Sequence, residues 1–168
     1  MAVVVFLRGM NLGSRRITNS DLVTTFQRLG YPNPTPYQAS GNVILPDSTQ
    51  IDAGELEAGL AAELGYEVPV FVRSADQVRE IAASPFAGQR GADGGKPQIV
   101  FLRRPSSAAL AGVFGLDDRH EVIGIEIHWL PPGGLAETGD LHKRLDLAVG
   151  PTTVRTLGTI ERIVKKLP

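Results

Sequence analysis

The sequence has no cysteine among its 168 residues. This absence excludes disulfides, zinc ribbons, iron–sulfur ligation and thiol catalysis. Aromatic residues make up only 6% of the chain, which leaves few rings on which nucleic-acid bases could stack. Neither sign of charge dominates, because 17 basic and 18 acidic residues give a formal net charge of −1. A strongly electropositive nucleic-acid binder would be more basic than this.

The sequence also lacks a long hydrophobic run. The apolar stretch near the N-terminus, Ala2–Leu7, is short, and no basic region precedes it. It is shorter than a signal-peptide core or a membrane span requires. We therefore expect a cytoplasmic protein with no membrane partner. The hydrophobic fraction of 42% is ordinary for a folded globular chain.

The first part of the chain alternates between strand and helix patterns. Residues 3–8 and 68–73 are β-rich, and two short strands are expected on either side of Ser40-Gly41. The two intervening helices have candidate caps at Thr18 or Ser20 and at Asp52. The resulting order over residues 2–73 is strand, helix, strand, strand, helix, strand, which is typical of a ferredoxin-like split βαβ fold. We predict an antiparallel sheet in the order 4-1-3-2, with two helices on one face.

The rest of the chain predicts a smaller second unit. Ser74 is a candidate cap for a short helix, and strands are expected at 98–103 and 122–130. The last helix is expected to begin after Pro151. We therefore predict an α+β protein without a tandem repeat. Its expected parts are a ferredoxin-like α+β subdomain over 1–83, a linker or mobile loop over 84–96, and a smaller C-terminal α+β subdomain over 97–168, docked on the first.

The predicted topology brings two polar segments to the same sheet edge. Segment 8–13 leaves the first strand, and segment 38–42 forms the predicted hairpin. Glycines there allow close backbone approach to a ligand, and arginine offers a planar fork for phosphate or carboxylate. These segments supply the candidate binding residues Arg8, Gly9, Asn11, Gly13, Gln38, Ser40, Gly41 and Asn42. Arg155 is a further candidate, from the expected start of the last helix, whose dipole favours an anion.

Several functions stay open at this stage. The first hypothesis is binding of an anionic small molecule at this edge, and the alternative is that the same residues only hold turns. A second hypothesis is an enzyme acting on a phosphorylated or carboxylated metabolite. The third is a nucleic-acid-associated protein, against which the near-neutral charge weighs. The sequence assigns no oligomeric state and predicts neither a cofactor nor a metal, since metal-binding and nucleotide-binding motifs are absent.

Two histidine–carboxylate pairs are candidate acid–base groups. His128 shares a predicted strand face with Glu126, and His142 lies one helical turn from Asp146. Neither pair has a recognisable nucleophile. We therefore expect His128 on a solvated strand face and His142 on a helix surface.

Two segments resemble the signatures of the DUF1697 family of bacterial proteins. The first match comprises Leu7, Arg8, Gly9, Asn11 and Gly13, and the second comprises Tyr37, Gln38, Ser40, Gly41, Asn42 and Val43. Near the C-terminus, Thr153, Arg155 and Thr159 also match, whereas Thr156-Leu157-Gly158 stands where the family has Asn-Trp-Asn. The resemblance implies a compact α+β fold in two subdomains and no established reaction. The departure at 156–158 implies different ligand binding if the family's site uses those side chains.

Overall fold

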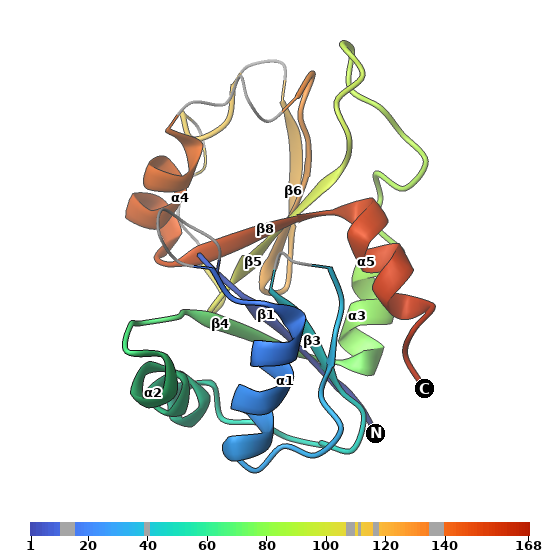
Figure 1. The fold of residues 1–168 in the computed structure, drawn as a ribbon. Coiled ribbons are helices and arrows are strands. Elements are labelled where there is room, and N and C mark those ends of the chain that lie inside the picture. The colour runs from blue at the N-terminus through green and yellow to red at the C-terminus, as the bar shows by residue number, and fades with distance from the viewer. Residues whose placement is uncertain (11–15, 39–40, 107–109, 111, 116–117, 135–139) are drawn as a thin grey trace. The chain divides into compact units, whose positions relative to one another are not determined.

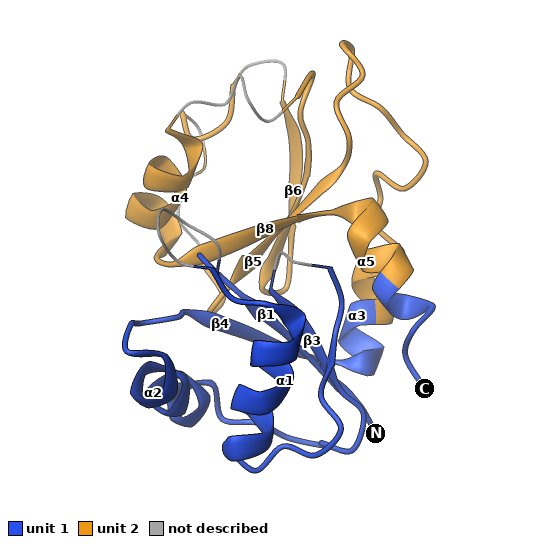
Figure 2. Ribbon diagram, viewed as in Figure 1, with its two compact units in different colours: residues 1–78, 163–168 blue, residues 79–162 orange. Residues whose placement is uncertain are grey.

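The computed structural model describes residues 1–10, 16–38, 41–106, 110, 112–115, 118–134 and 140–168. Within these residues the chain forms two four-stranded antiparallel sheets and five helices (Figure 1). The predicted α+β class is therefore confirmed. The chain divides into two units, Met1–Val78 with Ile163–Pro168, and Arg79–Arg162 (Figure 2). In the described part, every helix is too short or too polar to cross a lipid bilayer.

The first sheet is built by the N-terminal strands. Its order is β2-β3-β1-β4, which counted from the β4 edge reads 4-1-3-2, and its strand pairs are antiparallel. β4 runs directly into α3, which crosses from the first unit into the second. The elements are β1 (Val3–Leu7), α1 (Asn19–Arg28), β2 (Thr35–Pro36), β3 (Asn42–Leu45), α2 (Ala53–Leu64), β4 (Val70–Ser74) and α3 (Ala75–Ala82).

Local signals at the helix ends were predicted correctly. Thr18 forms a capping box with Asp21, in which each side chain bonds the other's backbone N–H at 3.0 Å. Asp52 caps α2 by accepting from the Glu55 N–H at 2.8 Å. α2 ends at Gly65, whose φ of +79° is the left-handed conformation that terminates helices. These short-range contacts depend only on neighbouring residues, which is why the sequence alone reveals them.

The core of the first unit lies between β1, β3 and β4 and the two helices α1 and α2. All five residues of β1 are buried, so the strand carries apolar side chains on both faces. Burial of this kind provides the main stabilising free energy, at roughly 25 cal/mol for each Å² of apolar surface. The principal buried side chains are Val5, Leu7, Leu22, Phe26, Val43, Leu45, Leu56, Leu60 and Val70.

The second unit contains a sheet of the same size as the first, so the expectation of a smaller C-terminal part is wrong in this respect. Its order is β6-β7-β5-β8, the same succession as in the first sheet, with antiparallel pairs. The elements are β5 (Gln98–Leu102), β6 (Arg119–Ile123), β7 (Glu126–Leu130), α4 (Leu141–Val149), β8 (Thr152–Thr156) and α5 (Leu157–Val164).

Two of these strands differ from the prediction. The run 122–130 was expected to be one strand, but Gly124 turns the chain with a φ of +62°, and Ile123 pairs with Glu126 across the resulting hairpin. Residues 152–156 were expected at the start of the last helix, but they form β8. The run Thr152-Thr153-Val154 is β-branched and favours a strand. Helix α5 instead begins at Leu157.

The two units repeat one another, although no tandem repeat was evident in the sequence. In the first, the Leu7 N–H donates to the Gly41 carbonyl at 2.7 Å, and in the second the Leu102 N–H donates to the Ile125 carbonyl at 2.9 Å. Both β1 and β5 end in Val-Phe-Leu followed by arginine. Both β4 and β8 end in Val-Arg before Ser or Thr, and each is followed at once by a helix.

Residues 84–96, expected as a linker or mobile loop, belong to the second unit and carry several backbone hydrogen bonds. The N–H groups of Asp93 and Gly95 donate to the Pro132 carbonyl at 2.7 and 3.0 Å. The Gly91 N–H donates to the Gly95 carbonyl at 2.8 Å. The loop is thereby joined to the segment that follows β7.

Candidate functional site

The end of β1 and the turn before β3 lie side by side, as the topology predicted. The hydrogen bond from the Leu7 N–H to the Gly41 carbonyl joins them directly. The next N–H, that of Arg8, donates to the Pro69 carbonyl at 3.1 Å. Arg8 itself is half-buried. These bonds fix the backbone on which the Arg8 side chain is carried.

Gly41 is required at this edge by space as well as by conformation. Its φ is +80°, where residues with a Cβ are strained. A Cβ at this position would lie 3.0 Å from the Leu7 carbonyl oxygen and 2.8 Å from Cγ of Met10. Any other residue would therefore push the turn away from β1.

Two polar residues of the turn have different environments. Asn42 is fully buried, and its Nδ2 donates to the Tyr37 carbonyl at 2.9 Å. The Tyr37 N–H donates back to the Asn42 carbonyl at 2.8 Å. Gln38 is exposed and has a φ of +59°, which is unusual for a residue other than glycine. Asn42 thus holds the turn, while Gln38 is presented to solvent. Of the remaining candidates, Asn11, Gly13 and Ser40 lie outside the described residues.

Arg155 does not lie at the start of a helix, so the expected contribution of a helix dipole is wrong. It is the fourth residue of β8 and is buried. Its Nη1 donates to Thr153 Oγ1 at 2.7 Å and to the Val154 carbonyl at 2.9 Å. Burial lowers the pKa of the Arg155 guanidinium to about 10. Arg155 belongs to the second unit, whereas the paired loops belong to the first.

Arg73 occupies the matching position in the first unit. It faces Val4 across the β1–β4 pair, as Arg155 faces Ile99 across the β5–β8 pair. Arg73 is buried, and its Nη1 donates to the Val72 carbonyl at 2.9 Å. Both arginines thus bond to a carbonyl of their own strand, which indicates a structural role repeated in the two units.

His128 is buried, not solvated as expected. Its Nδ1 lies 2.8 Å from Ser84 Oγ, and burial lowers the pKa of the imidazole. The prediction failed because alternation along a strand distinguishes two faces but does not show that both are covered. All five residues of β7 are buried, Glu126 included.

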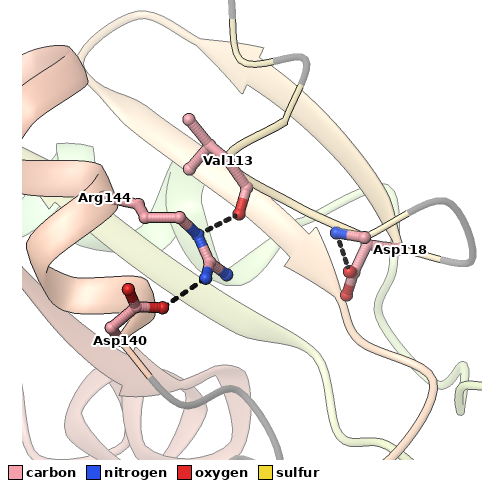
Figure 3. Close-up of polar contacts among 5 residues, drawn as sticks. Val113, Asp118, Asp140 and Arg144 are labelled. Carbon is pink, nitrogen blue, oxygen red and sulfur yellow. Dashed lines mark hydrogen bonds and ion pairs between the residues drawn. The ribbon is translucent and has the colours of Figure 1, made fainter.

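A cavity of about 360 Å³ in the second unit was missed by the sequence reasoning. It is lined by aromatic, acidic and basic residues from separate segments, and no sequence spacing connects them. Trp129 Nε1 donates to Asp118 Oδ1 at 2.7 Å. The Arg144 guanidinium lies between Asp140, with which it is ion-paired, and the Val113 carbonyl, to which Nε donates at 3.1 Å (Figure 3). The polar groups of Trp129, Asp118, Arg144 and Asp140 thus have hydrogen-bond or ion-pair partners within the cavity wall.

The residues that the structure describes contain no group of three or more histidine, aspartate or glutamate side chains placed to hold a metal ion.

The comparisons with known proteins agree with this architecture. The model of a family described as "Protein of unknown function (DUF1697)" matches residues 1–127. The chain belongs to the DUF1697 family. The matched range includes both polar segments of the paired-loop edge.

This DUF1697 protein also resembles a solved structure described as the conserved bacterial protein SP0830 from Streptococcus pneumoniae. The TM-score is 0.71 at 18% identity, covering 99% of this chain and 97% of that one. At this identity the likeness shows the fold alone. No curated protein matches the chain.

Proposed function

We propose that this DUF1697 protein binds an anionic small molecule, of phosphate or carboxylate type, at the edge formed by the 8–13 and 38–42 loops. The observation that carries the proposal is the hydrogen bond between the Leu7 N–H and the Gly41 carbonyl. It brings the residue after β1, Arg8, next to the turn. A guanidinium beside glycine-containing turns offers charge and geometry that suit an oxyanion.

The conformation of Gln38 supports the same proposal. A left-handed φ in a residue with a Cβ costs about 1–2 kcal/mol, and strain of this kind often accompanies function. Gln38 is exposed, so its amide is accessible to a ligand. In the proposed site Arg8 supplies the charge, Gln38 supplies neutral donors, and buried Asn42 holds the turn. Asn11, Gly13 and Ser40 are included because the sequence places them in the same two loops.

The first testable prediction concerns Arg8. Replacing Arg8 by Met removes a charge-assisted hydrogen bond, which contributes about 1.5–3 kcal/mol. We expect an anionic ligand to bind roughly tenfold more weakly or worse. The measurement is calorimetric titration of the full chain against a panel of phosphorylated and carboxylated metabolites.

Arg28→Met is the matched control for this experiment. Arg28 is exposed on α1 in the same unit, and its Nη1 lies 3.5 Å from Glu63 Oε2. Arg73, at the opposite edge of the sheet, is unsuitable because it is buried. If the Arg8→Met and Arg28→Met variants bind the anionic ligand with equal affinity, the paired loops have a purely structural role.

A further inference from the structure

The second unit contains a cavity of about 280 Å³ beside the first turn of α5. Its lining comes from three segments, which are Gly88 with Arg90, Lys96-Pro97, and Thr156 with the start of α5. Among its lining residues are three cations, Arg90, Lys96 and Arg162, and one carboxylate, Glu161. We call it the basic cavity.

Hydrogen bonds fix the walls of the basic cavity. The Leu157 N–H donates to the Pro97 carbonyl at 2.9 Å, which joins α5 to the segment before β5. Gln98 Nε2 donates to the Lys96 carbonyl at 3.0 Å. Thr156 Oγ1 accepts from the Thr159 N–H at 3.2 Å and so caps the helix. The cavity is therefore formed before any ligand arrives, which reduces the entropy cost of binding.

Arg162 folds back over the first turn of α5. Its Nη2 lies 3.5 Å from Thr159 Oγ1. A Cβ built on Gly158 would lie only 3.4 Å from Arg162 Nη1. The guanidinium thus lies beside Gly158, where the positive end of the helix dipole already disfavours a cation.

Among the described residues, the lining of the basic cavity carries more positive than negative charge. Within the described ranges, the structure records no acidic partner for the side chains of Arg90, Lys96 or Arg162. Glu161 leaves the lining with an excess of two positive charges. This differs from the larger cavity of the same unit, where Arg144 is ion-paired with Asp140. An unpaired cluster of cations around a preformed hollow attracts an anion of matching size.

We propose that the basic cavity is a second binding site, for a small phosphate-bearing molecule. Two guanidinium groups and one ammonium match the several oxygens of a phosphate group better than a single carboxylate. The volume falls just below the range of about 300–1,000 Å³ that is usual for ligand sites. It therefore suits a small phosphorylated compound and not a whole nucleotide.

Inorganic pyrophosphate is the probe for the test. The full chain carrying Arg8→Met is titrated by calorimetry at low ionic strength, so that any binding at the paired-loop edge is weakened. We expect pyrophosphate to bind in this background. Adding Arg162→Gln or Lys96→Gln should weaken binding by about tenfold each. Adding Glu161→Gln should strengthen it, because the one opposing charge is removed.

Lys143→Gln is the matched control. Lys143 is exposed in the same unit, outside the lining of the basic cavity, and the substitution makes the same change in net charge. Thermal unfolding of each variant establishes that it is folded. Absence of pyrophosphate binding, or equal weakening by Lys143→Gln and Arg162→Gln, would overturn the proposal. Binding of citrate in place of pyrophosphate would overturn the phosphate assignment. All these outcomes are independent of the Arg8 result.

Discussion

At the scale of single residues, the structure distinguishes side chains that hold the backbone from those offered to solvent. Asn42 and Arg155 were both candidates for ligand binding, yet each is buried and bonds to nearby protein groups. Gln38 and Arg162 have exposed side chains beside turns or cavities. Residue type alone does not make this distinction, because the same amide or guanidinium can serve either purpose.

Gly41 provides a residue-scale prediction for stability. Gly41→Ala adds a Cβ close to the Leu7 carbonyl oxygen at a φ of +80°. We expect the free energy of unfolding, measured in urea, to fall by about 2–4 kcal/mol. Gly30→Ala is the control, because Gly30 has a φ of +89° with open space around it. That variant should lose only the conformational cost of about 1–2 kcal/mol. Equal losses in the two variants would contradict the steric explanation.

His128 provides a prediction for pH dependence. Burial lowers its pKa in the folded state, although Glu121, opposite on β6, acts in the other direction. The unfolded chain therefore takes up a proton near pH 6.5 before the folded chain does. The contribution of His128 to the free energy of unfolding should be fully present above about pH 6.5. It should be lost as the pH falls toward the pKa of His128 in the folded state, by at most about 1.4 kcal/mol per pH unit.

The measurement is urea unfolding between pH 7.5 and about 5. His128→Asn should flatten the loss of stability in this window, apart from what other groups contribute. His142→Asn is the control, because His142 is exposed on α4. If His142→Asn flattens the profile as much as His128→Asn, burial of His128 is not the cause.

At the scale of elements, the glycine content of residues 84–96 does not reveal the contacts that this segment makes. The glycines of this segment predict a mobile loop, but Gly91 and Gly95 lie close to the chain after β7. A Cβ on either residue would lie 2.0 Å from the Pro131 carbonyl oxygen. Here glycine permits close packing of two backbones, which is a different use of the same small residue.

Hydrogen exchange provides the element-scale prediction. The amides of Asp93 and Gly95, which donate to the Pro132 carbonyl, should exchange slowly compared with that of Ala92. The structure assigns the Ala92 amide no acceptor among the described residues. Exchange resolved by NMR would measure all three. Equally fast exchange at the three positions would support the mobile-loop interpretation instead.

At the scale of the whole molecule, the chain uses one strand order twice. Both sheets place their first strand between the third and the fourth, and both continue from the last strand into a helix. The candidate sites do not follow this repeat. The paired-loop edge belongs to the first unit, and the basic cavity, lined in part by Thr156-Leu157-Gly158, belongs to the second.

The sequence by itself determined the features that depend on neighbours along the chain. The capping box at Thr18, the caps at Asp52 and Gly65, and the strand–helix order of residues 2–73 were all predictable from local pattern. The juxtaposition of Arg8 with the 38–42 turn was predictable too. It follows from strand direction: β3 runs antiparallel to β1, so the turn before β3 lies at the end of β1.

Tertiary structure alone decided what covers each surface and which separated segments meet. Residues 152–156 form β8 and not the start of a helix, because they pair with β5. Arg155 is therefore a buried strand residue. His128 became buried because both faces of β7 are covered. The basic cavity brings Arg90 and Lys96 together with Arg162, which lies far from both in the sequence. Periodicity records the alternation of side chains within one element, but the packing partner of each face is set by the rest of the chain.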